Sequence, residues 1–169
     1  MEISMSVIDE ALQANEEYAK SHNPLHQSPV PKRRLAVLTC MDTRLSYASL
    51  GLKQGDAHFI RNAGGIVTED TLRSLLVSHF LLQTEEVMLV NHTDCGLMKT
   101  TEEDLRTNIE RRTGTAVVSP ERFYAFNNVE KNVRYQLQKL KTHPWVTKEL
   151  TVRGFVYDVE TGRLKEVVE

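Results

Sequence analysis

The chain has 169 residues, of which 40% are hydrophobic and 26% charged, and its formal net charge at pH 7 is -2. This length is enough for one domain with a hydrophobic core and too short for two ordinary domains, so we expect a single domain. The nearly balanced charge gives no electrostatic reason to expect nucleic acid or an anionic membrane as a partner. Small molecules, or a second copy of the chain, are the expected partners.

No apolar segment of the sequence approaches the roughly 20 residues that are needed to span a bilayer. The acidic start, residues 1–4, lacks the basic and apolar regions of a signal peptide, and we therefore expect a cytoplasmic protein. Two cysteines do not make a disulfide framework in a chain of this size. In a reducing compartment, two such thiols point more often to a metal or to catalysis than to a bridge.

The N-terminal part of the chain predicts one helix and a linker. Residues 6–21 have a weak amphipathic pattern, and such a helix can either cap its own domain or pack on a second subunit. Residues 22–31 contain three prolines and predict an extended linker. We therefore divide the domain into an N-terminal arm and linker, residues 1–31, and an α/β core, residues 32–169. The basic residues 32–34 are interpreted as a solvated charge run.

Alternating strands and helices are predicted for the first half of the core. Short apolar runs typical of buried parallel strands are followed by turns or helices. The expected strands are residues 35–39, 57–61 and 87–90, with a short helical piece at residues 46–52. Thr68 is the expected cap of a longer helix. The apolar face with which this helix is expected to cover the sheet contains Leu72, Leu75, Leu76, Phe80 and Leu82.

The second half of the core is expected to hold two helices and a hairpin. A capping box at residues 100–103 starts a charged helix that ends near Arg112, before Gly114. The Ser119-Pro120 pair indicates the start of a long helix over residues 121–141. Residues 151–158 and 163–168 are typical of a hairpin at a sheet edge. The prediction is an α/β fold with a mainly parallel central sheet, flanking helices and an antiparallel edge.

Potential metal ligands follow two of the predicted strands. Cys40 comes directly after the first strand, and His92 and Cys95 come after the third, separated by two residues. Thiolate and imidazole are the ligands that zinc prefers. Because the chain has no third cysteine, a closed site with four thiolates, or with three thiolates and one imidazole, is impossible. Two thiolates and one imidazole leave a fourth position for water or substrate, as in a catalytic zinc site.

Asp42 and Arg44 lie beside the first of these thiols. A guanidinium paired with a carboxylate keeps it ionised and fixes its orientation, so that Asp42 can accept a hydrogen bond from an oxygen on zinc. An ordinary salt bridge in a loop is the alternative interpretation. For Asp94 we favour a role as a turn residue. The other histidines are interpreted as packed or surface residues: His22, His26, His58, His79 and His143.

Three segments resemble the signature sequences of the β-class carbonic anhydrases, particularly their short prokaryotic type. They are Cys40-Met-Asp-Thr-Arg44-Leu, Arg61-Asn-Ala-Gly-Gly65 and His92-Thr-Asp-Cys95-Gly, and residues 153–163 are similar to the terminal hairpin of that family. The resemblance implies one Zn²⁺ per chain, held by Cys40, His92 and Cys95, with Asp42 and Arg44 controlling the fourth position. It also implies a homodimer, which could assemble further, in which a protruding N-terminal helix packs across the partner.

The activity that the resemblance implies is the reversible hydration of carbon dioxide to bicarbonate and a proton through zinc-bound hydroxide. It also implies that the turn formed by Gly64, Gly65, Ile66 and Val67 lies near the substrate. A zinc hydrolase of carbon disulfide or carbonyl sulfide could use the same ligands. A non-enzymatic zinc-binding module, with Asp42 as a permanent fourth ligand, is the remaining alternative. A cysteine phosphatase is disfavoured, because Arg44 follows Cys40 too closely for a phosphate-binding loop.

Overall fold

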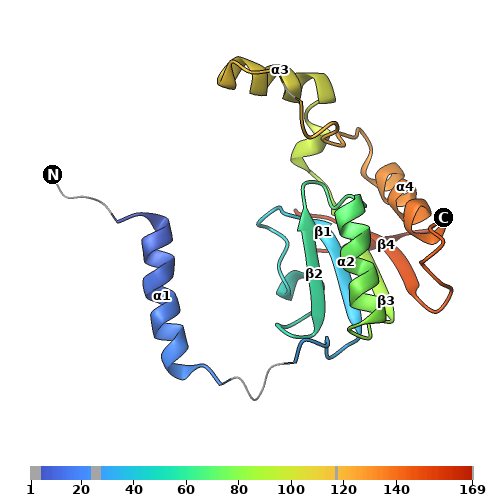
Figure 1. Cartoon of the computed structure of the whole chain (residues 1–169). Helices are drawn as coiled ribbons and strands as arrows, with labels where there is room; N and C mark the ends of the chain where they lie inside the picture. Colours follow the sequence, from blue (N-terminus) through green and yellow to red (C-terminus); the bar gives the residue numbers. More distant parts are fainter. Residues whose placement is uncertain (1–4, 24–27, 117, 169) are drawn as a thin grey trace.

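The computed structural model describes residues 5–23, 28–116 and 118–168. Within these ranges the chain forms five strands, four α-helices and two short 3-10 segments (Figure 1). None of the described helices is long and apolar enough to cross a membrane. The predicted linker lies partly at residues 24–27, outside the described part of the chain.

The five strands form one sheet in the order β2-β1-β3-β4-β5. The first four are parallel, and β5 pairs antiparallel with β4, so the expected fold class and its antiparallel edge are confirmed. Each strand begins and ends within about two residues of its expected bounds. The bounds are β1 Leu35–Cys40, β2 Ala57–Asn62, β3 Glu86–His92, β4 Thr151–Tyr157 and β5 Leu164–Val167.

Helices α2 (Glu69–Phe80) and α4 (Val129–Lys141) cover one face of this sheet (Figure 1). Helix α4 can approach β4 closely because Gly154 has no side chain. A Cβ atom at Gly154 would lie 2.5 Å from Cγ1 of Val133 and 2.7 Å from Cδ1 of Leu137. The core on this side consists mainly of aliphatic side chains from the strands and from α4: Ala36, Leu38, Val87, Leu89, Val133, Leu137, Leu140, Val152 and Val156.

The opposite face of the sheet is covered by the chain that follows β1. This segment contains Leu45, the 3-10 segment η2 (Ala48–Leu50) and Leu52, and its apolar side chains pack with Val37 and Val90. Strand β1 is consequently buried along its whole length. Burial on both faces explains why its sequence is a continuous apolar run rather than an alternating one.

The expected helix over residues 121–141 is wrong for residues 121–128. Helix α4 begins only after Asn128, whose side chain accepts a hydrogen bond from the Lys131 amide. The preceding segment is held in a different conformation by Glu102 at the start of α3 (Glu102–Thr113). The carboxylate of Glu102 accepts hydrogen bonds of 2.8 and 2.9 Å from the amides of Phe123 and Ala125. These amides are therefore satisfied without a helix.

Helix ends follow local sequence closely elsewhere. Thr68 caps α2, as expected, and Gly114 ends α3 in a left-handed conformation with φ +68°. The cap of α3 is Thr101 rather than Thr100, and its hydroxyl accepts a hydrogen bond from the Asp104 amide. The expected apolar face of α2 is only partly correct: Leu82 lies beyond the end of the helix, Leu76 lines a surface groove, and Phe80 is 60% exposed instead of packing on the sheet. Helical spacing places Leu75 on the sheet but turns Phe80 away from it.

The N-terminal helix α1 (Val7–Ser21) extends away from the sheet (Figure 1). Ser6 and Asp9 form a complete capping box at its start, which explains where the helix begins. None of its residues is buried against the rest of the described chain. The exposed side chains include four large apolar ones: Val7, Ile8, Leu12 and Tyr18. The helix thus protrudes, as the resemblance implied.

Substitution of Gly154 tests how tightly α4 packs on the sheet. We expect Gly154→Ala to lower the free energy of unfolding by about 1–3 kcal/mol, because the added methyl group overpacks the contact with Val133 and Leu137. The measurement is urea denaturation of the zinc-free protein. Gly96→Ala is the control, since a Cβ at Gly96 meets no atom within 4 Å. Equal stability of the two variants would contradict the packing argument.

Candidate metal centre

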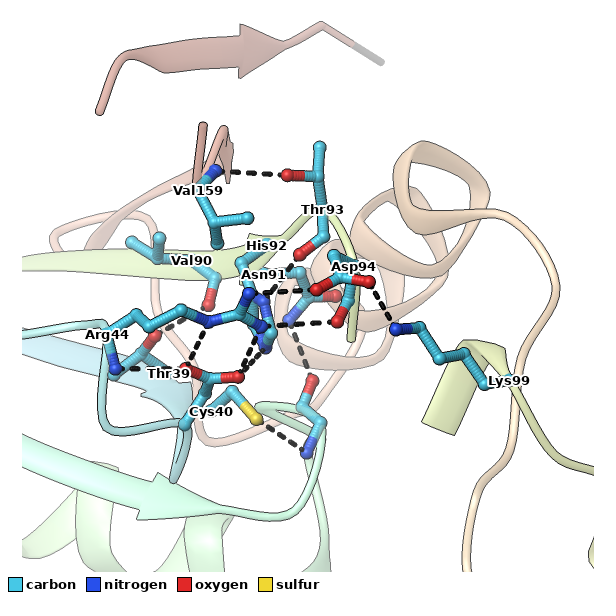
Figure 2. Close-up of polar contacts among 12 residues, drawn as sticks. Thr39, Cys40, Arg44, Val90, Asn91, His92, Thr93, Asp94, Lys99 and Val159 are labelled. Carbon is cyan, nitrogen blue, oxygen red and sulfur yellow. Dashed lines mark hydrogen bonds and ion pairs between the residues drawn. The ribbon is translucent and has the colours of Figure 1, made fainter. Parts of the chain in front are cut away.

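The three predicted metal ligands come together at one edge of the sheet. Cys40 is the last residue of β1, His92 is the last residue of β3, and Cys95 lies in the turn that follows. Their ligand atoms all lie within 4.8 Å of one another, and all three side chains are buried. Figure 2 shows the Cys40 sulfur and the His92 ring in this region, at the ends of adjacent strands.

The imidazole of His92 is oriented for metal binding. Its Nδ1 atom lies 2.8 Å from the carbonyl oxygen of Thr93, which can only accept, so Nδ1 carries the proton. The other ring nitrogen, Nε2, is buried and has no hydrogen-bond partner in the described part of the chain. A buried nitrogen without a partner is unfavourable unless a ligand is bound to it. The fixed tautomer directs the free lone pair of Nε2 toward the ligand cluster.

The two thiols form a coupled pair. The interaction between the two side chains lowers the pKa of Cys40 to about 4 and raises the pKa of Cys95. The backbone amide of Gly64 also donates to the Cys40 sulfur, at 3.3 Å. Burial opposes ionisation of His92, but the nearby Cys40 sulfur and the Thr93 carbonyl raise its pKa overall. Negative charge is thus favoured at Cys40, the position where a cation would bind.

Asp42 and Arg44 form the predicted pair beside this cluster. The guanidinium of Arg44 donates from Nε to Oδ1 of Asp42 at 2.9 Å and from Nη2 to Oδ2 at 2.8 Å. These hydrogen bonds hold the pKa of Asp42 well below its usual range. Oδ2 also lies 3.8 Å from Nε2 of His92. The carboxylate is therefore ionised, fixed in orientation, and directed toward the nitrogen that has no partner.

Arg44 is itself fixed by Asp94. Its Nη1 atom donates to the Asp94 carboxylate at 2.8 Å, and its Nη2 atom donates to the Asp94 carbonyl at 3.2 Å. Lys99 forms an ion pair with the same carboxylate (Figure 2). Asp94 adopts a left-handed turn conformation with φ +56°, so its expected turn role is correct but incomplete. Its side chain also orients the arginine that holds Asp42.

Arg61 is a residue whose contribution the sequence did not indicate. It donates from Nε to the carbonyl oxygen of Cys40 at 3.1 Å and from Nη2 to the carbonyl oxygen of Asp42 at 2.6 Å. The contacts cross from β2 to the last residue of β1 and to the turn that follows it, so they fix the backbone that carries the ligand and the carboxylate. Only the pairing of the two strands brings this arginine to the turn.

The turn at Gly64, Gly65, Ile66 and Val67 lies directly beside Cys40. Both glycines have left-handed conformations, with φ +81° and +62°. A Cβ atom on Gly65 would lie 2.8 Å from Nδ2 of Asn91 and 3.1 Å from the backbone nitrogen of Cys40, so glycine is required there. Ile66 and Val67 are buried. The turn thus reaches the ligand cluster through its backbone.

The other histidines considered lie in contacts of their own. His58 bonds to the Ser78 hydroxyl and the Pro29 carbonyl, and His79 bonds to the Thr84 carbonyl. His22 lies at the end of α1, and His143 packs against Trp145. His26 lies outside the described residues. In the described ranges, the ligand cluster consists of Cys40, His92 and Cys95 alone.

These donors fit zinc. Two sulfurs and one imidazole nitrogen form a soft ligand set that suits zinc rather than calcium or magnesium, whose ligands are oxygens. The buried, unpartnered Nε2 of His92 and the lowered pKa of Cys40 both favour a bound cation. A hydrogen bond that fixes the other ring nitrogen is typical of histidines that bind zinc.

Comparisons with known proteins agree with this geometry. The sequence profile of the carbonic anhydrase family matches residues 35–164. Over 165 residues the chain is 42% identical to β-carbonic anhydrase 1 of Mycobacterium tuberculosis, covering 96% of this chain and 99% of that protein. A carbon disulfide hydrolase of Acidianus sp. is 35% identical, over 79% of this chain and 77% of that protein. The crystal structure of carbonic anhydrase from Streptococcus mutans has a TM-score of 0.89 and 38% identity, covering 98% of this chain and all of that one. The chain belongs to the β-class carbonic anhydrase family.

Proposed function

We propose that this protein is a zinc-dependent carbonic anhydrase, which catalyses the reversible hydration of carbon dioxide to bicarbonate and a proton. The observation that carries the proposal is the arrangement at the end of the sheet. A buried cluster of Cys40, His92 and Cys95 adjoins an ionised carboxylate, Asp42, that Arg44 fixes in orientation. Membership of the carbonic anhydrase family supports the same activity.

Each residue of the site has a separate role in this proposal. Cys40, His92 and Cys95 hold the zinc ion, which when bound supplies Lewis-acid activation of water, bringing the water pKa to about 7. Asp42 accepts a hydrogen bond from the reacting water at Oδ2 and orients its lone pair toward the substrate carbon. Arg44 keeps Asp42 ionised and in place. Gly64, Gly65, Ile66 and Val67 form the wall of the substrate site beside Cys40.

Carbon dioxide is favoured over carbon disulfide as the substrate. Both are linear electrophiles, so the ligands do not discriminate between them. The chain is more similar, over more of its length, to the carbonic anhydrase of M. tuberculosis than to the carbon disulfide hydrolase of Acidianus. Hydrogen sulfide release from carbon disulfide, at a rate above that of carbon dioxide hydration, would reverse this choice.

The functional unit that we propose is a homodimer in which helix α1 of each chain packs on the partner chain. In a single chain no residue of α1 is buried, so its apolar side chains are in contact with water: Ile8 is 74% exposed and Leu12 is 60% exposed. The sheet-covering helix α2 forms one wall of a mainly apolar groove of about 1100 Å³. Its walls include Leu72, Leu76, Val77, Phe80, Leu81 and Trp145. Mutual burial of these surfaces accounts for the outward position of Phe80.

The cytoplasm is the compartment that we propose. Cys40 and Cys95 are free thiols, and the metal centre needs both of them as thiolates. A reducing compartment keeps neighbouring thiols available as ligands instead of oxidising them to a disulfide.

Loss of a ligand should remove the metal. We expect Cys40→Ser and His92→Gln to bind far less than one zinc per chain and to lose carbon dioxide hydration, because neither replacement supplies an equivalent ligand. Zinc content is measured by atomic absorption and activity by stopped-flow hydration. His22→Gln, an exposed histidine at the end of α1, is the matched control and should retain both. Full activity of the zinc-depleted variants would overturn the assignment.

Substitution of Asp42 should separate metal binding from activity. Asp42→Asn retains the size of the side chain but removes its charge, so Arg44 keeps its ion pair with Asp94 and loses the one with Asp42. We expect one zinc per chain and a roughly 10- to 100-fold lower kcat for hydration, as is typical when a group that supports a metal site is changed. Unchanged kcat at full zinc content would show that Asp42 has only a structural role.

The dimer proposal predicts that charge on the apolar face of α1 prevents association. Leu12→Glu should shift the chain from dimer to monomer, because it places a carboxylate in an apolar interface. The change is measured by sedimentation velocity at several concentrations. Gln13→Glu adds the same charge at the next residue of α1 and should remain dimeric. A wild-type monomer at every concentration would contradict the proposal directly.

A further inference from the structure

Three buried amide side chains connect helix α4 to the turn beside Cys40. Asn91 lies on β3, next to His92, while Asn132 and Gln136 lie one helical turn apart on α4. Their exposed fractions are 1%, 9% and 2%. Polar side chains at these positions interrupt an otherwise apolar contact between the helix and the sheet, where Val133 and Leu137 pack. Buried amides of this kind are expected to have specific partners.

The three amides form a continuous series of hydrogen bonds. Gln136 donates from Nε2 to Oδ1 of Asn132 at 3.0 Å, and Asn132 donates from Nδ2 to Oδ1 of Asn91 at 2.8 Å. Asn91 in turn donates from Nδ2 to the carbonyl oxygens of Gly64 and Gly65, at 2.9 and 3.3 Å. Figure 2 shows Asn91 beside His92, directed toward the turn.

The series also returns to the same turn. The remaining acceptor, Oε1 of Gln136, receives a hydrogen bond of 2.9 Å from the backbone amide of Val67. Both ends of the series therefore terminate on backbone groups of one four-residue turn. Carbonyl oxygens can only accept and the Val67 N–H can only donate, so the orientation of all three amides is determined. Reversing any one of them would bring like groups into contact.

The turn that these amides hold contacts the metal centre. The amide of Gly64 donates to the Cys40 sulfur at a distance of 3.3 Å. A hydrogen bond to the charged form of a ligand stabilises that form. The position of this N–H depends on the adjoining carbonyls, which Asn91 holds. Displacement of the turn would therefore remove a hydrogen bond from the sulfur that binds zinc.

We infer that Asn132 and Gln136 are positioning residues for the zinc centre, acting through Asn91 and the Gly64 amide. Neither side chain touches the metal ligands, and α4 contributes no ligand of its own. The expected effect on carbon dioxide hydration rests on the proposed function. The expected effect on zinc affinity does not. It assigns to one face of α4 a role in zinc affinity as well as in packing.

Two substitutions interrupt the series at different points. Gln136→Met retains the length of the side chain but leaves the Val67 amide and Oδ1 of Asn132 without partners. Asn132→Asp retains the size of the side chain but places a carboxylate oxygen against Oδ1 of Asn91, which can only accept. We expect each to raise the zinc dissociation constant by about tenfold or more, and to lower kcat more than it raises KM.

The controls separate positioning from general destabilisation. Gln138→Met makes the same replacement on the exposed face of α4 and should leave zinc affinity unchanged. Leu137→Ala loosens the packing of α4 against Gly154 without removing any of these amides. It should lower the melting temperature of the zinc-free protein while leaving the zinc dissociation constant within about twofold of wild type.

Zinc dissociation constants are measured by competition with a chromogenic chelator, and folding is checked by circular dichroism. Weakened zinc binding in folded Gln136→Met or Asn132→Asp, but not in Leu137→Ala, supports the inference. Equal zinc affinity in all variants that fold would overturn it, as would equal weakening in Leu137→Ala. Absence of carbon dioxide hydration in zinc-loaded wild type would instead refute the proposed function, and the competition measurement would still decide this inference.

Discussion

The parallel pairing of β1 with β3 is the interaction on which the metal centre depends. It sets Thr39 opposite Val90, so that Cys40 and His92 end adjacent strands at the same edge of the sheet. Neither strand could slip by one residue without turning its buried side chains to the opposite face. The hydrophobic core on both sides of β1 therefore fixes the distance between ligands that are 52 positions apart in the chain. The continuous apolar sequence of β1 therefore has two roles: it fills the core, and it places Cys40 at the end of the strand.

Electrostatics at this edge explains why the cluster is suited to a cation. The Cys40 sulfur, which has a lowered pKa, is buried beside Nε2 of His92, which has no hydrogen-bond partner among the described residues. The nearby guanidinium groups are engaged elsewhere: Arg44 with the carboxylates of Asp42 and Asp94, and Arg61 with backbone carbonyls. These contacts order the surroundings while leaving the ligand atoms available. A fixed second layer of this kind is what distinguishes a preorganised metal site from three residues that lie close together.

The described part of the chain also has two apolar surfaces outside the core, one on α1 and one beside α2. In the proposed dimer, the other chain covers the exposed apolar side chains of α1 and the apolar groove beside α2. If two copies cover these surfaces, the same α2 that packs on the sheet with Leu75 contributes Phe80 and Val77 to an interface. The metal centre and the interface would then share a scaffold, since the Gly64–Val67 turn leads directly into the Thr68 cap of α2.

Much of the local structure is determined by the sequence itself, since caps, turns and apolar periodicity act over a few residues. Ser6, Thr68 and Gly114 mark helix ends correctly, and the strands lie where the apolar runs predict them. The candidate ligands and the Asp42–Arg44 pair could likewise be proposed from residue types and spacing. The start of α4 could not, because Glu102, distant in sequence, binds the amides of Phe123 and Ala125. The contributions of Arg61, Asn91, Asn132 and Gln136 were equally hidden. Each depends on hydrogen bonds between segments that only the folded sheet and its covering helix bring together, and an isolated arginine or amide in a sequence carries no sign of its partner.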